Sequence, residues 1–362
     1  MIKLPNIEVS FKQLAGTLIE RSERGIVILI VKDDTDKTFE YKEYNSIIAA
    51  QKDKALFTTE NLKYINDIFN YSLSKLAVVR IDKTGGSMAD ALQIVEHNIK
   101  SGWVTIADAT QEEWTTLVSW IKTKETERKT YKAVVYKASV CDCKHIVNFF
   151  NEQVTFADER GTVTGDKYCP SLAGILASCN VRKGSTYFKC TNLTSVKEVA
   201  NNEDAVANGK LILINDIDTV KIALGINSLT TTDGNTSTED MKYIDTVEAM
   251  DIIMDDISTV FKREYLGNYK NNYDNQVLLI SAINSYLKQL AGENILDNTY
   301  ANKVDVDTES QRAAWLGVGK AEAEGWSEQK LKDTAFKRSV FLTGDIKILG
   351  SMENLTLSIN LL

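Results

Sequence analysis

Two glycine-rich segments are the first residues in this sequence that could bind a phosphate. KTGGS at 83–87 joins a strand-like run to a helix-like run, and GVGK stands at 317–320. A P-loop requires glycine, four residues and then Gly-Lys-Ser/Thr, so that backbone N–H groups and the lysine surround the phosphates. In the first segment the lysine precedes the glycines, and the second segment has no strand before it. We interpret 83–87 as a tight turn between a strand and a helix, and we expect no nucleotide site.

One cluster has side chains of the kind that bind metals, namely Cys141, Cys143 and His145. Structural zinc sites have four ligands, commonly with two residues between paired cysteines. Here one residue separates each pair, and the other cysteines, at 169, 179 and 190, are widely spaced. We therefore expect no metal and no cofactor, and buried structural positions for all five cysteines. Scattered cysteines in odd number also favour a reducing compartment.

Nucleophilic catalysis would need one of the two histidines, His97 or His145, beside a serine or cysteine. No Gly-x-Ser-x-Gly motif supplies the serine, and polar neighbours place His97 on an exposed helix face. We interpret the acidic groups as solvated faces and turns; they lie at 33–36, 216–218, 255–256 and 305–307. The last lacks the glycine and distal glutamate of an EF-hand. No catalytic site is expected, although a cytoplasmic α/β enzyme of unknown substrate remains the alternative.

Length and composition indicate two ordinary soluble domains. The chain has 362 residues, 43% of them hydrophobic and 25% charged. A net charge of −8 disfavours nucleic acid as a partner. No run approaches the ~20 apolar residues of a membrane span, and the N-terminus lacks the features of a signal peptide. We expect a protein that is made in a cytoplasm and does not insert into membranes.

Alternating strands and helices are predicted from Gly25 onward. Ile26–Val31 is a continuous apolar run, typical of a strand buried on both faces. Thr110 and Glu113 form a capping box before a buried helical stripe. Single helices between strands imply a mostly parallel sheet, so residues 25–236 are expected to form an α/β domain. The expected strands lie at 76–81, 103–107, 133–136 and 154–156, and the expected helices at 62–73, after 87, after 110 and around 146–150.

The pattern changes near residue 209. Residues 210–225 read as a hairpin that could pack with either domain, and the polar stretch TTTDGN at 230–235 indicates a boundary. Long amphipathic helices follow over 244–261 and 277–287, and strand-like runs lie at 340–342 and 346–349. We expect residues 237–346 to form a C-terminal α+β domain.

Both ends of the chain are expected to be extended strand-forming arms, residues 1–24 and 347–362. Apolar side chains alternate with polar ones at Ile7, Val9 and Phe11, and again at Leu355, Leu357 and Ile359. A terminal strand can complete its own sheet or pair with an exposed edge on another molecule. Two such arms indicate a chain that can be linked to copies of itself.

Several long segments resemble contractile tail sheath proteins, most closely the short sheaths of myophages and R-type bacteriocins of Gram-positive bacteria. We expect no counterpart of the inserted domain that longer members of the family carry. The segments are PNIEVSFKQLAGTLIERSERGIVILIVKD at 5–33, VKIALGINSLTT at 220–231, AMDIIMDDI at 249–257, NNYDNQVLLISAINSYL at 271–287 and VFLTGDIKILGSMENLTLSINL at 340–361.

The resemblance implies a structural subunit that stacks as six-fold rings, or as a multi-start helix, around a rigid tube. In the family, terminal arms add strands to a small sheet in the inner domains of neighbouring subunits. Carried over to this sequence, Ile7, Val9 and Phe11 would pair through the N-terminal arm, and Leu355, Leu357 and Ile359 through the C-terminal arm. The hairpin with Ile222 and Leu224 would accept a strand. The α/β domain would face outward and the C-terminal domain the tube, with Arg312, Lys320 and Lys330 as candidate contacts.

The resemblance also implies partners and an energy source. The partners are other copies of the chain, the tail tube protein, and the baseplate and tail-terminator proteins. The sheath would belong to a virion tail or a bacteriocin particle assembled in the bacterial host cytoplasm. It would drive the tube through a target cell envelope with free energy stored at assembly, moving its subunits nearly as rigid bodies.

Overall fold

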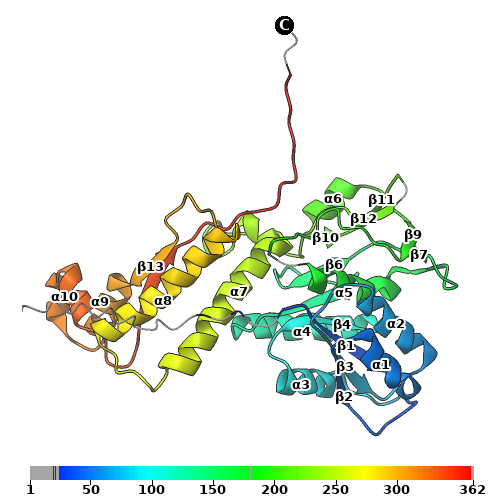
Figure 1. Ribbon diagram of the computed structural model, residues 1–362, viewed down its shortest axis with the longest axis horizontal. Coiled ribbons are helices and arrows are strands. Elements are labelled where there is room, and N and C mark those ends of the chain that lie inside the picture. The colour runs from blue at the N-terminus through cyan, green and yellow to red at the C-terminus, as the bar shows by residue number, and fades with distance from the viewer. Residues whose placement is uncertain (1–18, 20, 22–23, 180, 218, 360–362) are drawn as a thin grey trace, which may run out of the picture. The chain divides into compact units, whose positions relative to one another are not determined.

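The computed structural model describes residues 19, 21, 24–179, 181–217 and 219–359 (Figure 1). The N-terminal arm residues Ile7, Val9 and Phe11 lie outside this part of the chain. The chain divides into two compact units. The α/β unit contains the described part of Ser22–Asp255 and of Ile348–Leu362. The C-terminal unit contains Asp256–Lys347 together with Ile19 and Arg21.

A seven-stranded sheet forms the centre of the α/β unit, with strand order β10-β6-β5-β4-β1-β3-β2. β2 runs antiparallel to β3, and the other neighbours are parallel. The apolar run of β1 is buried on both faces, as its sequence predicts. The mostly parallel sheet confirms the expected fold class. The strands are β1 (Ile26–Lys32), β2 (Tyr41–Tyr44), β3 (Lys75–Ile81), β4 (Gly102–Ile106), β5 (Tyr131–Tyr136), β6 (Ile146–Phe149) and β10 (Lys210–Leu211).

Helices cover both faces of this sheet. The chain crosses from β1 to β3 in one direction along the sheet, and it crosses from β3 to β4 and from β4 to β5 in the opposite direction. Right-handed crossovers therefore put α2 on the face opposite α3 and α4. The capping box of Thr110 and Glu113 begins α4 as expected. The helices are α1 (Ile47–Lys52), α2 (Thr59–Phe69), α3 (Met88–Asn98), α4 (Gln111–Thr126), α5 (Cys169–Ser178) and α6 (Asn202–Ala207), with 3₁₀ turns η1 (Lys54–Leu56) and η2 (Gly165–Tyr168).

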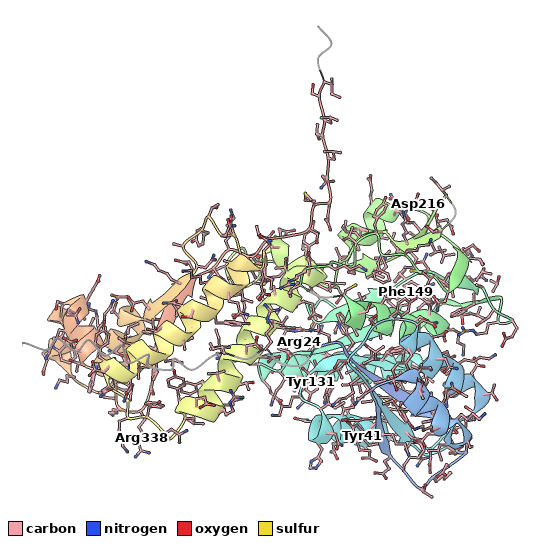
Figure 2. All side chains as sticks on the ribbon, in the orientation of Figure 1. Arg24, Tyr41, Tyr131, Phe149, Asp216 and Arg338 are labelled. Carbon is pink, nitrogen blue, oxygen red and sulfur yellow. The ribbon has the colours of Figure 1, made fainter. Side chains whose placement is uncertain are left out.

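One sequence expectation in this unit is wrong, because residues 146–150 are not a helix. Ile146–Phe149 forms strand β6, paired in parallel with β5. The segment is too short for a stable helix, and its β-branched and aromatic residues suit a buried strand. Phe149 is fully buried, 6.1 Å from Tyr168 between ring centres (Figure 2).

Two small antiparallel sheets complete the unit. One has the order β8-β7-β9, and the other is the hairpin β11–β12. Leu213, Val220 and Ile222 of the hairpin belong to the core of the α/β unit, so the hairpin packs on that side. The strands are β7 (Gln153–Phe156), β8 (Thr162–Thr164), β9 (Leu193–Val196), β11 (Leu213–Asp216) and β12 (Thr219–Ile222).

The C-terminal unit is α+β. It begins at Asp256, inside α7, whereas the polar stretch at 230–235 lies within the α/β unit. Buried Leu279, Ile283 and Leu287 line one face of α8. β13 and β14 form a two-stranded antiparallel sheet. The 3₁₀ turn η3 (Glu239–Lys242) and most of α7 (Ile244–Val260) belong to the α/β unit. After the end of α7, the elements of the C-terminal unit are the π-helical turn η4 (Phe261–Tyr265), α8 (Tyr273–Gly292), β13 (Lys303–Val306), α9 (Thr308–Gly317), η5 (Ala321–Gly325), α10 (Glu328–Asp333) and β14 (Leu342–Asp345).

The chain after β14 returns to the α/β unit from Ile348 onward. Residues 349–359 are not assigned to a strand, although their alternation is that of one. Strand-like runs at 340–342 and 346–349 were expected, and the strand is found at 342–345 instead. Among the described helices, none is long and apolar enough to cross a membrane.

Candidate functional site

A buried histidine links three elements of the α/β unit. The Nδ1 of His145 lies 2.8 Å from Oε2 of Glu125 in α4, and its Nε2 lies 2.9 Å from Oδ1 of Asp251 in α7. Burial disfavours the charged ring, but Asp251 and Glu125 outweigh it and raise the pKa of His145 to about 9. The imidazolium therefore donates from both nitrogens at neutral pH.

Three further ion pairs join α7 to residues in or next to the strands of the sheet. The ammonium of buried Lys132 in β5 lies 2.9 Å from Glu248 and 3.1 Å from Asp251. Asp255 accepts hydrogen bonds from Arg24 at 2.9 Å and from Thr130 at 2.6 Å. Residues 248, 251 and 255 share one helix face because their spacing is three and four. We call this set the α7 ion-pair face.

The expectation that 255–256 and 33–36 are solvated is wrong for three of their carboxylates. Asp256 is fully buried and accepts a hydrogen bond from Tyr286 at 2.5 Å. Asp255 is in the ion-pair face. Asp33 is also fully buried, and it accepts from the backbone N–H of Thr58 and the amide of Asn61, both at 2.7 Å. Buried carboxylates persist only with such donors, and the donors come from distant parts of the chain.

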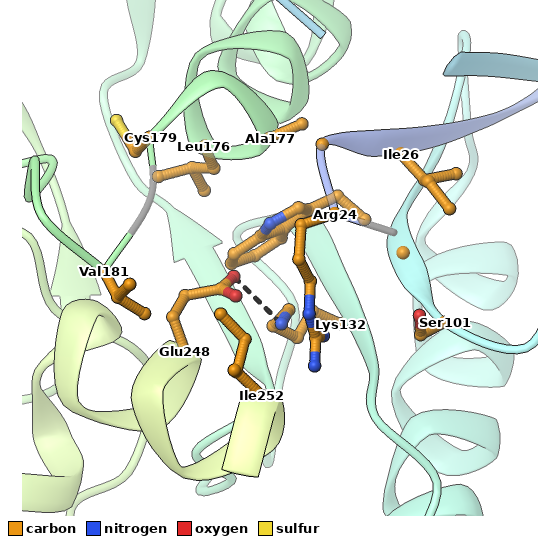
Figure 3. Close-up of a pocket in the computed structure, with 13 residues that line it drawn as sticks. Arg24, Ile26, Ser101, Lys132, Leu176, Ala177, Cys179, Val181, Glu248 and Ile252 are labelled. Carbon is orange, nitrogen blue, oxygen red and sulfur yellow. Dashed lines mark ion pairs between the residues drawn. The ribbon is translucent and has the colours of Figure 1, made fainter. Parts of the chain in front are cut away.

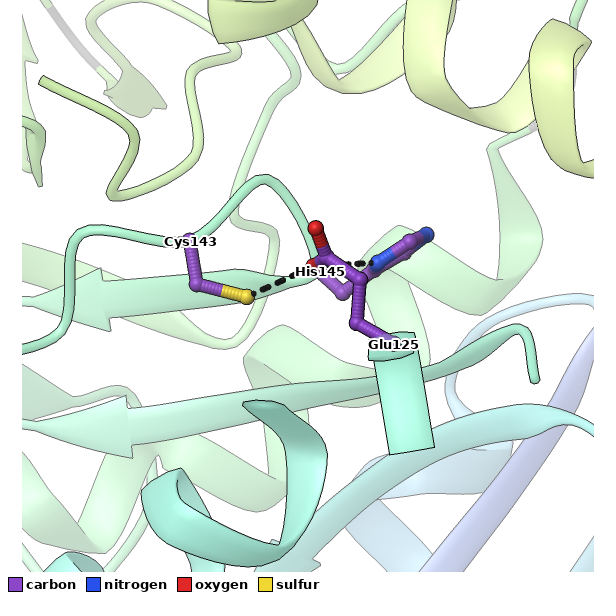
Figure 4. Close-up of side chains that lie close together, drawn as sticks. All are labelled: Glu125, Cys143 and His145. Carbon is purple, nitrogen blue, oxygen red and sulfur yellow. Dashed lines mark hydrogen bonds and ion pairs between the residues drawn. The ribbon is translucent and has the colours of Figure 1, made fainter. Parts of the chain in front are cut away.

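Glu125, Cys143 and His145 place three potential metal ligands within 4.8 Å of one another (Figure 4). The atoms of these residues that could bind a metal already take part in hydrogen bonds within the protein. Cys143 donates to Glu125 at 3.0 Å, and burial raises the pKa of that thiol. Lys144 also binds Glu125, at 2.8 Å. A charged imidazolium has no lone pair for a metal, so the cluster acts as a hydrogen-bonded ionic bridge.

A small cavity of about 30 Å³ lies beside the ion-pair face (Figure 3). Arg24, Lys132 and Glu248 line it, and the Lys132 ammonium is 5.5 Å from the ring centre of Trp103. The Nε of Arg24 is buried and has no hydrogen-bond partner among the residues that the structure describes. This volume suits about one water molecule rather than a substrate.

At the position where open α/β sheets usually bind ligands, groups of this chain hydrogen-bond to one another. That place lies beyond the carboxyl ends of β1 and β4, where the strand order reverses. Lys32 there donates to Oε2 of Glu113 at 2.8 Å and to the carbonyl oxygen of Asp108 at 2.9 Å. The hydroxyl of Tyr64 donates to the Asp108 carboxylate at 2.6 Å. These groups stabilise the α/β unit internally.

The glycine-rich segments and the cysteines have structural roles. Ser87 caps α3, and a Cβ on Gly86 would lie 2.2 Å from the Asp82 carbonyl oxygen, so 83–87 is the expected tight turn. Residues 317–320 follow the end of α9. Four of the five cysteines are buried and Cys179 is partly exposed.

The hairpin with Ile222 and Leu224 cannot accept a strand as we expected, because both of its edges are occupied. On β12, Ile222 donates to the carbonyl oxygen of Phe188 at 3.0 Å, and Val220 accepts from Cys190 at 2.8 Å. On β11, the side chain of Asn151 binds both the N–H and the carbonyl oxygen of Leu213. The adjoining 187–190 segment and these side-chain bonds close both edges.

The β13–β14 sheet in the C-terminal unit has one closed edge and one open edge. Asn284 of α8 binds the N–H and the carbonyl oxygen of Val304, which closes β13. The backbone N–H of Asp307 donates to the carbonyl oxygen of Phe341, so these two residues form a hydrogen-bonded pair of the antiparallel ladder. Hydrogen-bonded and non-hydrogen-bonded pairs alternate along such a ladder. The backbone N–H and carbonyl groups of Leu342 and Gly344 therefore point away from β13. These outward groups have no partner among the described residues.

The three C-terminal arm residues are highly exposed. Leu355, Leu357 and Ile359 are 89%, 71% and 73% exposed. A row of large apolar side chains on an extended segment is unusual at the surface of a monomer. This segment and the open β14 edge are thus complementary features of one chain.

The three basic residues expected at the tube surround a pair of tryptophans. Arg312 is held inward, donating to the carbonyl oxygens of Ala323, Glu324 and Trp326 at 2.8–3.1 Å. Lys320 lies 5.8 Å from both tryptophan ring centres, Trp315 and Trp326, and Lys330 lies 5.9 Å from the latter. Arg312 therefore has a structural role, and the two lysines stay candidates for a surface contact.

Comparison with known proteins identifies the class. Residues 236–361 match the family model of the phage tail sheath C-terminal domain. The chain is 29% identical over 370 residues to the tail sheath protein of Clostridium phage phiCD119, covering 100% of both. The fold matches the contracted helical sheath of the anti-feeding prophage with a TM-score of 0.71 at 11% identity, over 99% of each chain.

A second solved structure agrees with this. The sheath tail protein of Desulfitobacterium hafniense has a TM-score of 0.68 at 15% identity, over 83% of this chain and 94% of that one. These likenesses confirm the expected resemblance to contractile tail sheath proteins and support a role as a structural sheath subunit.

The ionised His145 predicts a pH-dependent stability. Its pKa in the folded chain lies above the ~6.5 of an unfolded histidine. The stabilisation is therefore fully present below about pH 6.5 and is lost as the pH rises toward 9. Urea unfolding should give a free energy of unfolding that falls by roughly 2–3 kcal/mol over this interval.

Two variants make this measurement specific. His145→Gln should be less stable at pH 6.5 and lose most of the pH dependence. His97→Gln is the matched control, because His97 is exposed, and it should retain the dependence. An unchanged slope in His145→Gln would show that the ionic bridge does not hold α7 to the sheet.

Proposed function

We propose that this chain polymerises by strand exchange into a contractile sheath around a rigid tube, and that the sheath drives the tube through a target cell envelope. One observation carries the proposal. The chain offers an exposed, strand-forming segment at 355–359 and an open strand edge at Leu342 and Gly344. Neither feature is satisfied within the described part of the chain, and each can satisfy the other in a neighbouring copy.

The pairing would be β-strand addition. Backbone hydrogen bonds to the outward groups of Leu342 and Gly344 would supply affinity. The alternating apolar side chains of the arm would determine which face of the added strand is buried against the neighbouring subunit. Strand addition at one edge is heterologous, so it generates rings or helices rather than closed dimers. The N-terminal arm, with Ile7, Val9 and Phe11, would extend the same sheet from another copy.

The remaining partners follow from the sheath role. The C-terminal unit would face the tube protein, with Lys320 and Lys330 as candidate contacts. Baseplate and terminator proteins would hold the two ends of the sheath, in a phage tail or a bacteriocin particle assembled in the host cytoplasm. The free energy of contraction would be stored at assembly. The buried α7 ion-pair face supports motion of the α/β unit as a rigid body.

Removal of the arm should abolish assembly without unfolding the subunit. Residues 354–359 are all exposed, so a deletion that starts at residue 354 takes no described residue from a hydrophobic core. We expect no cylinders by negative-stain electron microscopy, and a melting temperature within a few degrees of the full chain. Cylinders of normal appearance from the truncated chain would contradict the role of the arm.

Blocking the open edge should have the same effect. Leu342→Pro removes an N–H that points away from β13, so the internal β13–β14 bonds remain. We expect a folded subunit that does not polymerise. Leu342→Val keeps the N–H and serves as the matched control, which should assemble. If the proline variant assembles equally well, strand addition occurs elsewhere.

A further inference from the structure

The root of the C-terminal arm is hydrogen-bonded to the α/β unit before the arm becomes free. The hydroxyl of Ser351 donates to Oδ2 of Asp245 at 2.7 Å, where α7 begins. The carboxylate of Glu353 accepts from the hydroxyl of Thr186 at 2.6 Å. Both acceptors are carboxylates, which makes these bonds stronger than bonds between neutral groups.

The surface that receives these two residues is closely fitted. A Cβ on Gly184 would lie 2.7 Å from Oγ of Ser351, so the Ser351 side chain lies directly against this glycine and would have to move to make room for a larger residue. Thr186 Oγ1 also accepts the backbone N–H of Gly225 at 2.9 Å, which fixes the hydroxyl that binds Glu353. We call Gly184, Thr186 and Asp245 the arm cradle.

Hydrogen bonds within the α/β unit fix the positions of the cradle residues. The backbone N–H of Ile244, at the start of α7, donates to the carbonyl oxygen of Gly225 at 3.0 Å. The other carboxylate oxygen of Asp245, Oδ1, accepts a hydrogen bond from the backbone N–H of Thr246 at 2.8 Å. The 187–190 segment that follows Thr186 is paired with β12. The position of the cradle is therefore set by the fold of the α/β unit.

We propose that the arm cradle is a binding site for residues 351–353 that sets how far the arm can reach into a neighbouring subunit. This inference rests on the proposed strand exchange. With the cradle occupied, residues 354–362 are free and span at most about 30 Å. With it empty, residues 348–362 are free and span at most about 50 Å. Release of residues 351–353 from the cradle would therefore lengthen the free part of the arm when subunits move apart.

Protease cleavage after Glu353 tests the cradle in the isolated subunit. A glutamyl endopeptidase needs an extended, accessible segment, and the occupied cradle withholds this one. Gly184→Ala should raise the rate of loss of the 354–362 fragment about tenfold, which corresponds to ~1.4 kcal/mol. Gly350→Ala is the matched control, because a Cβ there meets nothing within 4 Å, and its rate should not change.

Three other variants make the test independent of the folding of Gly184→Ala. Ser351 is exposed, so Ser351→Ala cannot disturb a core and should also speed cleavage. Thr186→Val should do the same, whereas Thr186→Ser keeps the hydroxyl and should restore the slow rate. Equal cleavage rates in Ser351→Ala, Thr186→Val and the unmodified chain would overturn the cradle.

The same variants separate this inference from the proposed function. If cleavage responds as stated but neither the unmodified chain nor the variants form cylinders, the cradle stands and the sheath assembly fails. If cylinders form and cleavage does not respond, assembly stands and the cradle is overturned. With both intact, we expect Gly184→Ala cylinders to vary more in diameter than Gly350→Ala cylinders, because the arm length is no longer fixed.

Discussion

Backbone hydrogen bonding at strand edges is the constraint on which this structure depends. An N–H or carbonyl group at an edge must find water, a side chain or another strand. The β11–β12 hairpin closes both edges within its own unit, and Asn284 closes β13 at Val304. The outward groups of Leu342 and Gly344 have no such partner in the described chain. Under the proposed strand exchange, this open edge and the exposed arm would join copies of the chain.

The α7 ion-pair face supplies the rigidity that such a linkage requires. Burying the carboxylate of Asp251 is costly, and it is tolerated because His145 and Lys132 pair with it; Arg24 pairs with the partly buried Asp255. Removal of one partner would leave a buried charge, so the face specifies a single position of the helix on the sheet. In the proposed sheath, this internal order would let the α/β unit move as a rigid body.

Local sequence patterns predicted the parts of the fold that depend on nearby residues. The apolar run of β1, the capping box at Thr110 and the turn at 83–87 were all predicted correctly, since each needs only a few adjacent residues. Residues 255–256 were misjudged because their partners are distant. His145 and Asp251 are 106 positions apart, and nothing in either neighbourhood indicates the contact. The acceptor strand was misplaced for the same reason, since the state of an edge depends on what lies beside it.

Electron microscopy of the purified chain, expressed without other tail components, tests the central claim most directly. The account predicts long hollow cylinders whose helical reconstruction shows residues 355–359 of one copy paired with Leu342 and Gly344 of another. Discrete small oligomers that stay discrete when the cognate tube protein is added would contradict it. So would cylinders in which the β14 edge remains unpaired.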